Sequence, residues 1–406
     1  MYFLFLKLII YNDAMIQLEE NKGIPRSILI MMSVVAGLTV ANLYYNQPLL
    51  EEMKASLGAN EVETNLITVI TQAGYAAGLL FVVPLADMLS RRKIIMTNMA
   101  TAVLMALVIA CTADIKVVWA ASFILGMCSV VPQIFVPMAG LFSKPENKSR
   151  NMGYVLSGLL TGVLGARVIS GYLGDWVGWR AMYGIAAAIM LICLAVTLKM
   201  LPVMRPSFKG SYPQLMRTVG EIFFSHPNIR LYSLRASCSF ASMMSIWSCM
   251  AFHLSGSPFN AGSDKVGLLG LCGIAGAMAA SGVGKYIPRF GILRFSTFGS
   301  VFQLLAWGIA FLFGVFYAGL ALAIILVDIG AQCQQLSNQS GCLKEVPHAS
   351  NRANTIFMTS LFIGGSVGTF CSGAIWPHWG WHGVCCVGIL FATLSLIISA
   401  YERLHR

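Results

Sequence analysis

Long apolar stretches with almost no charges recur along the whole chain, and they constrain its fold more than any other feature. Hydrophobic residues make up 57% of the 406 residues and charged residues only 11%, against about 25% charged residues in an average soluble domain. Roughly 20 apolar residues are enough for a helix to cross a bilayer. Twelve such stretches are found, at residues 27–50, 66–85, 94–111, 117–142, 153–173, 179–198, 231–254, 266–287, 292–313, 317–342, 353–376 and 383–400. We therefore expect an all-α membrane protein with twelve transmembrane helices.

One segment occurs twice, at an interval close to half of the chain length. Residues 151–180 resemble residues 353–382, so that Gly162 corresponds to Gly364 and Gly171 to Gly373, both with an offset of 202 (364 − 162 = 202). Small residues on one face of a helix allow a second helix to approach closely in lipid. Duplicated halves are also common in membrane transport proteins. The repeat therefore predicts two pseudo-symmetric six-helix bundles.

The most polar stretch divides the two sets of helices. We expect an N-terminal cytoplasmic segment at 1–26, a first bundle at 27–200, a cytoplasmic linker at 201–228, a second bundle at 229–400 and a cytoplasmic tail at 401–406. A surface helix is expected within the linker, at 214–224. Residues 2–10 are apolar but too short to span a bilayer, and Met15 is an alternative start of translation.

Basic residues gather in the connections on one side of the predicted helices. Because cytoplasmic loops of membrane proteins are enriched in Lys and Arg, both termini are expected in the cytoplasm, in a multi-pass inner-membrane protein. This topology also explains the net charge of +11 without a nucleic-acid partner. The cations on this side include Lys22, Arg26, Arg91, Arg92, Lys93, Lys144, Lys148, Arg150, Arg217, Lys285, Arg289, Arg294, Lys344, Arg352 and Arg403.

No motif for a metal, a cofactor or catalysis is found. The 11 cysteines are scattered through apolar segments without a C-x-x-C pair, and the 6 histidines lack the spacing of metal ligands. Neither a phosphate-binding glycine-rich loop nor a nucleophile–base motif occurs. We therefore expect no cofactor, no metal and no enzymatic activity, and transport driven by ATP is not expected.

Polar residues within the tenth apolar stretch form the sharpest pattern in the sequence. Asp328, Gln332, Gln335 and Gln339 are spaced i, i+4, i+7 and i+11, which places them on one face of a helix. A carboxylate at membrane depth costs several kcal/mol unless it faces a cavity or a partner. Asp328 is therefore the candidate for proton coupling. The alternative is that these groups only hydrogen-bond to neighbouring helices.

Two arginines also lie within predicted helices. Arg167, in the fifth, would either attract an anionic group or pair across the interface between the bundles, or else extend towards the outer surface and Asp175. Arg235, in the seventh, would either extend to the membrane interface or form an ion pair with Asp328.

Two short motifs follow corresponding helices of the two halves. Leu85-Ala86-Asp87 is followed by Arg91-Arg92-Lys93 between helices 2 and 3, and residues 284–291 are a degenerate copy between helices 8 and 9. The first motif is similar to the signature loop of the major facilitator superfamily, and the chain resembles its twelve-helix branch of drug:proton antiporters and sugar-efflux permeases. The antiporter signature of helix 5 corresponds to Gly153, Gly162, Ala166, Arg167 and Ser170, with Arg in place of the usual Pro.

The resemblance implies where the functional residues lie. Helices 1, 4, 7 and 10 line the central cavity in this superfamily, so the expected cavity residues are Asn42, Tyr45, Asn46, Gln133, Arg235, Trp247, Asp328, Gln332 and Gln335. The signature loop implies a cytoplasmic latch of Asp87, Arg91 and Arg92. Arg167, Gly162 and Gly171 complete the expected gating residues.

The predicted function is secondary active transport of a small solute by alternating access, in the efflux direction. Proton coupling would depend on Asp328 alone, because Ser122 occupies the position where antiporters carry a basic residue in helix 4. The expected partners are a small-molecule substrate, protons and the lipid bilayer, with the protein as a monomer. The alternatives are an uncoupled facilitator or importer, and a membrane sensor that retains the fold without transport.

Overall fold

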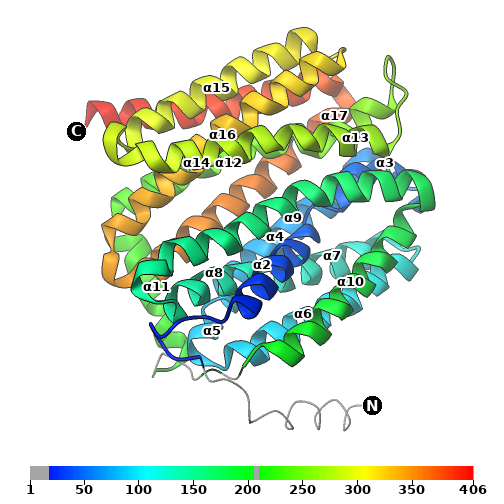
Figure 1. The fold of residues 1–406 in the computed structure, drawn as a ribbon. Coiled ribbons are helices and arrows are strands. Elements are labelled where there is room, and N and C mark those ends of the chain that lie inside the picture. Colours follow the sequence, from blue (N-terminus) through cyan, green and yellow to red (C-terminus); the bar gives the residue numbers. More distant parts are fainter. Residues whose placement is uncertain (1–17, 203, 205–209, 406) are drawn as a thin grey trace.

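The fold consists of long helices that run side by side in two groups (Figure 1). The computed structural model describes residues 18–202, 204 and 210–405, and every regular element within these residues is helical. Nine of the described helices are long and apolar enough to cross a membrane, and one of them, α17 (Ser350–Leu404), has 55 residues. At 1.5 Å per residue, such a length is enough for two crossings. The expected all-α membrane fold of two six-helix bundles is confirmed.

The first bundle contains spans 1 to 6. Several of these spans are divided by short breaks. In chain order they are α2 (Arg26–Ala41) with α3 (Asn46–Leu57); α4 (Glu61–Ala77) with the π-helical turn η1 (Gly78–Val82) and α5 (Leu85–Met88); α6 (Arg91–Cys111); α7 (Ile115–Cys128) with α8 (Val131–Phe142); α9 (Lys148–Val177), which follows the turn η2 (Pro145–Asn147); and α10 (Trp179–Met200).

The second bundle follows the linker helix α11 (Tyr212–Ser225). Its first span, α12, is not among the nine apolar helices, since serines interrupt its apolar residues. The spans are α12 (Pro227–Ser255); α13 (Ser263–Leu269) with η3 (Gly270–Cys272) and α14 (Gly273–Phe290); α15 (Ile292–Phe313); α16 (Tyr317–Glu345); and, after η4 (Pro347–Ala349), the two halves of α17, which are separated by a break at Gly380.

The first span is interrupted between Ala41 and Asn46. Pro48 has no N–H to donate to the carbonyl of Tyr44, and its ring crowds that carbonyl, so a regular helix cannot continue through this turn. Residues 42–45 instead form a turn, and the Tyr45 N–H donates to the Ala41 carbonyl at 3.2 Å. The break precedes Pro48, and the span continues to Leu57 rather than ending at residue 50.

The duplicated glycines make equivalent contacts in the two bundles. A Cβ added to Gly162 would lie 2.1 Å from the Gly37 carbonyl oxygen, and one added to Gly364 would lie 2.4 Å from the Ser237 carbonyl oxygen. Thus α9 packs against α2 in the way that α17 packs against α12, and only glycine allows this approach. The breaks that follow are also equivalent, because Gly178 (φ +84°) and Gly380 (φ +51°) both adopt a conformation that favours glycine.

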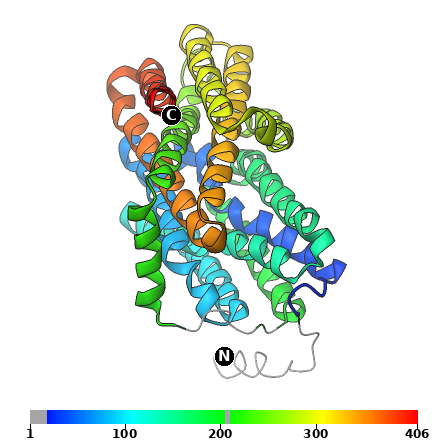
Figure 2. The ribbon, with the colours of Figure 1, turned by 90° about the vertical axis from the view of Figure 1, so that its left-hand side faces the viewer.

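The two bundles are in contact through several pairs of helices. We call the end that carries α11, the start of α2 and the end of α17 the linker end, and the end where α3 finishes and α13 begins the far end (Figure 1). Between the bundles, α17 packs on α4, α13 packs on α9, and α3 packs on α12 and α13. Figure 2 looks onto the linker end, with the first bundle below and the second bundle above.

Candidate functional site

Asp328 is a buried carboxylate on α16. The residue is only 8% exposed, and its side chain lies against the start of α14. A Cβ added to Gly273 would lie 3.1 Å from Asp328 Oδ2, and one added to Gly276 would lie 2.9 Å from Asp328 Cβ. The two glycines therefore make room for the acid. Among the described residues, no group donates a hydrogen bond of normal geometry to this carboxylate.

Arg167 is a buried cation on α9, in the opposite bundle. The residue is 3% exposed, and its Nε donates to Gln47 Oε1 at 2.8 Å. The guanidinium carbon lies 4.2 Å from the ring centroid of Trp247 and 4.8 Å from that of Tyr44. A guanidinium placed over aromatic rings is stabilised by their negative faces. The alternative in which Arg167 extends to the outer surface is therefore wrong.

The acid and the base are neighbours, but they do not form an ion pair. Their charges are close enough to interact, yet no nitrogen of Arg167 lies within 4.0 Å of an Asp328 oxygen. The Trp247 side chain faces Asp328, but its buried Nε1 makes no hydrogen bond of normal geometry. We call Tyr44, Gln47, Arg167, Trp247 and Asp328 the charge site.

The structure brings together only some of the predicted cavity residues. Trp247 and Asp328 belong to the charge site. Asn42 donates to the Thr39 carbonyl of its own helix at 3.1 Å, and Asn46 bonds to Thr68 and Thr71 of α4. Tyr45 is buried next to α10. These three residues of the first span therefore pack within the first bundle in this structure, and their assignment to a central cavity stays a prediction.

The amides of α16 lie on two different faces. Gln332, Gln335 and Gln339 are half-buried, and Gln339 donates to Asn354 Oδ1 at 2.7 Å. Gln334 and Asn338, which the sequence pattern did not single out, are fully buried. The Gln334 amide donates to Ser300 Oγ at 2.6 Å and to Ser395 Oγ at 2.8 Å, so this second face ties α16 to α15 and α17.

Arg235 lies away from the charge site. It is fully buried, forms an ion pair with Glu402 of α17 and donates through Nε to Asn338 Oδ1 at 2.8 Å. Both predictions for this residue, the pair with Asp328 and the extension to the membrane interface, are therefore wrong. The reason is that Glu402, a carboxylate in the expected C-terminal tail, is part of a helix that continues to Leu404 and is buried against α12.

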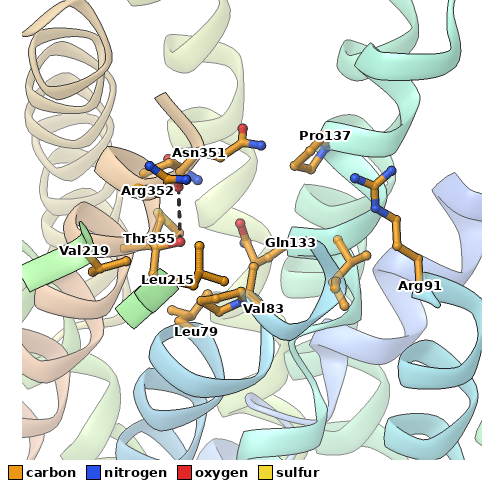
Figure 3. A pocket seen from close by; sticks show the side chains of 15 residues that line it. Leu79, Val83, Arg91, Gln133, Pro137, Leu215, Val219, Asn351, Arg352 and Thr355 are labelled. Atoms are coloured by element: carbon orange, nitrogen blue, oxygen red, sulfur yellow. Dashed lines mark hydrogen bonds between the residues drawn. The ribbon is translucent and has the colours of Figure 1, made fainter. Parts of the chain in front are cut away.

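A small cavity of about 50 Å³ lies between the bundles towards the linker end. Figure 3 shows Gln133 and Pro137 of α8 on one side and Asn351, Arg352 and Thr355 of α17 on the other. Leu215 and Val219 of α11 lie near Thr355, so the linker helix is part of the cavity wall. Gln133 also donates to the Tyr75 hydroxyl at 3.3 Å.

The predicted gating residues have different surroundings. Arg91 lines the same cavity and lies over Phe142, whereas Arg92 donates to the Leu198 carbonyl at the end of α10. Asp87 lies outside the residues whose side chains the structure describes. Gly162 packs within the first bundle, as described above. Gly171 lies between the bundles, where an added Cβ would be 2.5 Å from the Ser263 carbonyl oxygen.

The contacts between the bundles include two equivalent polar pairs at the far end. The Ser263 hydroxyl donates to the Gly171 carbonyl at 2.9 Å, and the Asn65 amide donates to the Thr369 carbonyl at 2.8 Å, with Gly373 packed against Asn65. Gly171 and Gly373 are the matching positions of the sequence repeat. Sequence reasoning identified the glycines but missed Ser263 and Asn65, which lie in the facing helices.

Two members of the charge site, Tyr44 and Gln47, were also missed. The prediction assumed a continuous helix through residue 46, on which Asn42, Tyr45 and Asn46 share a face. The turn at 42–45 rotates the chain, so that Tyr44 and Gln47 face Arg167 instead. Pro48 is the one signal in the sequence that could have indicated this turn.

Among the described residues, no group of three His, Cys, Asp or Glu side chains could hold a metal ion.

Two helical bundles with a buried acid and base between them define a polytopic membrane protein of the transporter class. The family model described as Major Facilitator Superfamily matches residues 30–369. The chain therefore belongs to the major facilitator superfamily, whose members carry small-molecule substrates and are typically monomeric.

The relatives that match are themselves described as transporters. The transporter YgaY of Escherichia coli O157:H7 is 34% identical over 389 residues, which cover 96% of this chain and 98% of the relative. The inner membrane transport protein YnfM of E. coli K12 is 24% identical and covers 95% and 93% of the two chains. Multidrug resistance protein D of E. coli K12 is 25% identical over 198 residues, 47% of this chain and 48% of the relative. The protein is thus a multi-span membrane transporter.

Solved structures show the same fold at low sequence identity. The nucleoside transporter NupG (D323A mutant) has a TM-score of 0.72 at 14% identity and covers 92% of this chain and 98% of its own. A bacterial homologue of the human lysosomal transporter Spinster, in an inward-facing and occupied conformation, has a TM-score of 0.73 at 12% identity, with 93% and 96% covered.

Proposed function

We propose that this transporter exports a small solute by alternating access and that the charge site is where solute and proton act. The observation that supports the proposal is the position of Arg167 and Asp328, which are buried, face each other and belong to different bundles. A rocking motion of one bundle against the other would change their separation directly. A site at the interface of two repeats is also where secondary transporters bind their substrates.

The small cavity between the bundles would belong to the cytoplasmic half of the transport path. The bundles are in contact at the far end, and the cavity lined by Gln133 and Arg352 lies towards the linker end. The linker end carries the basic connections, which the positive-inside rule assigns to the cytoplasm together with both termini. Solute would then enter from the cytoplasm, and release would require the far-end contacts of Ser263 and Asn65 to break.

Proton coupling would follow from competition at Asp328. A buried carboxylate is costly while it is charged, and protonation removes that cost. Arg167 favours the charged form, so the balance depends on the distance between the two groups, which changes when the bundles rock. The export direction is supported by the partial similarity to multidrug resistance protein D.

Transport into sealed vesicles, with and without an imposed pH gradient, tests this function. We expect the wild type to show solute flux that a pH gradient accelerates, and Asp328→Asn to lose the acceleration. Glu146→Gln, an exposed acid at the linker end, is the matched control and should behave like the wild type. Flux in Asp328→Asn that responds to the gradient as the wild type does would refute the role of Asp328.

A second candidate is an uncoupled facilitator or importer. It is supported by Ser122, which is buried on α7 with no hydrogen-bond partner, where proton antiporters carry a basic residue. In this case flux would occur but would not respond to pH in the wild type. Absence of flux for every solute of a broad panel would instead favour a membrane sensor.

A further inference from the structure

The charge site contains hydrogen-bonding capacity that the described residues leave unused. A guanidinium has five N–H donors, and Arg167 uses one of them, in its bond to Gln47. The Asp328 carboxylate receives no hydrogen bond of normal geometry from the described residues, and the Trp247 Nε1 donates none. All three residues are less than one-tenth exposed. Buried polar groups are ordinarily satisfied, and of these three residues Trp247 alone has a buried polar atom, Nε1, without a hydrogen-bond partner.

Arg167 and Asp328 offer opposite kinds of hydrogen-bonding group and carry opposite charges. Arg167 presents donors and a positive charge from α9, and Asp328 presents acceptors and a negative charge from α16, with more than 4.0 Å between their nitrogen and oxygen atoms. A solute with a single charge would satisfy one of the two groups and leave the other buried without a counter-charge. An uncompensated buried charge is strongly unfavourable, so a purely cationic or purely anionic solute fits this site poorly.

We propose that the substrate is a zwitterion of the α-amino-acid class, with its carboxylate on Arg167 and its ammonium group on Asp328. This inference rests on the proposed function and names the substrate class for the same site. Carboxylate–guanidinium and ammonium–carboxylate hydrogen bonds are charge-assisted, at distances of about 2.7–2.9 Å. Bound in this way, the solute satisfies both buried groups and adds no net charge to the site.

The aromatic residues of the site are consistent with this substrate. The rings of Tyr44 and Trp247 contact the guanidinium and stabilise its charge through their negative faces. The Trp247 side chain faces Asp328 and its ring lies over the Arg167 guanidinium, so it borders both charged groups. Gly273 places backbone beside the acid, and the neighbouring side chain there, Leu164, is apolar and has no polar group that would compete with an ammonium group for the carboxylate.

A zwitterion would also connect the two bundles. Its carboxylate would be held by the first bundle and its ammonium group by the second, so the bound solute would draw α9 and α16 together. A solute that bridges the bundles favours the occluded state through which alternating access must pass, whereas singly charged solutes bind one bundle only. The same charges would therefore select the substrate and couple its binding to the conformational change.

The test is a binding experiment on the purified full-length protein with matched analogues. The twenty L-amino acids are first compared by their effect on the thermal unfolding midpoint, and the best of them is then compared with its methyl ester, a cation, and its N-acetyl derivative, an anion. We expect both derivatives to bind at least tenfold more weakly than the zwitterion. Equal binding of either derivative, or no stabilisation by any amino acid, would overturn the proposal.

Two single variants supply a test that loss of folding cannot imitate. Asp328→Asn should lose the zwitterion but gain relative preference for the N-acetyl derivative, and Arg167→Gln should gain relative preference for the methyl ester. Arg217→Gln, an exposed cation on α11 with an 81% exposed side chain, should retain the wild-type order of affinities. An unchanged order in both site variants would show that these charges do not recognise the solute.

The failure of the zwitterion inference can be distinguished from the failure of the proposed transport function. If vesicles transport other solutes in a pH-dependent way while no amino acid binds, the zwitterion inference fails and the transporter proposal stands. If the wild type transports nothing from a broad panel that includes amino acids, the proposed function itself fails.

Discussion

Replacing Gly171 by alanine should weaken the contact between the bundles at the far end. The added Cβ would lie 2.5 Å from the Ser263 carbonyl oxygen and 2.9 Å from Gly267 Cα. A carbon–oxygen contact is normally about 3.3–3.6 Å, so α9 and α13 would have to move apart by about 1 Å. The obstructing atoms are backbone, which cannot rotate out of the way as a side chain can. The hydrogen bond from the Ser263 hydroxyl to the Gly171 carbonyl, now 2.9 Å, would lengthen as well.

The expected magnitude follows from the cost of overpacking. One extra methyl group in a tightly packed contact costs about 1–3 kcal/mol, and here the cost falls only on the state in which the far end is closed. The intrinsic gain of alanine over glycine in a helix, up to about 1 kcal/mol, is the same in both states and cancels. The ratio of far-end-open to far-end-closed molecules should therefore rise by about 5-fold to 150-fold.

Distance measurements between two spin labels can detect this shift. Labels at Ala55 and Lys265, both exposed at the far end on different bundles, would be introduced as genetically encoded amino acids, so that the native cysteines remain unchanged. Gly165→Ala is the matched control on the same helix, because its added Cβ meets nothing nearer than 4.0 Å. If the two variants gave the same distance distribution, the assignment of Gly171 to gating would be wrong.

Two further variants test other contacts of the structure. Asn65→Ala removes the bond to the Thr369 carbonyl, so the far-end-open population should rise by the equivalent of about 1 kcal/mol; an unchanged label distance would contradict this. Glu402→Gln removes the carboxylate that neutralises Arg235, so it should destabilise the folded protein by about 3–5 kcal/mol, measured by thermal unfolding in detergent. The control is Glu221→Gln, which removes the acid of the exposed Arg217–Glu221 pair on α11 and should change stability by less than about 1 kcal/mol. If both variants lost a similar amount of stability, the buried pair would have no special role.

The positions of the helices were predictable because lipid leaves the backbone few alternatives. An apolar segment must satisfy its own backbone hydrogen bonds, and a helix does so locally. For this reason α6, α10 and α15 lie close to the predicted ranges 94–111, 179–198 and 292–313. The ends of the helices were less predictable, since they depend on what covers them. Glu402 illustrates this, because it lies in a buried helical turn that the hydropathy pattern assigned to a tail.

The residues of the candidate site were predictable only where burial of a charge was itself the signal. Asp328 and Arg167 stand out in apolar stretches, and the structure places both between the bundles. Arg235 stands out equally, yet its charge is compensated within the second bundle by Glu402, 167 residues later in the chain. A sequence displays the charge but not its partner, so it cannot separate a structural ion pair from a functional group.

The sequence by itself determined that the chain spans a membrane, that its two halves repeat and that an acid and a base lie at membrane depth. These properties follow from composition and spacing, which act locally along the chain. Only the tertiary structure decided that Tyr44 rather than Tyr45 faces Arg167, that Asp328 faces Arg167 rather than Arg235, and that the bundles are in contact at the far end. Each of these depends on how helices distant in the sequence rotate and pack against one another, and that is set by a turn before Pro48 and by close contacts at Gly171 and Gly273.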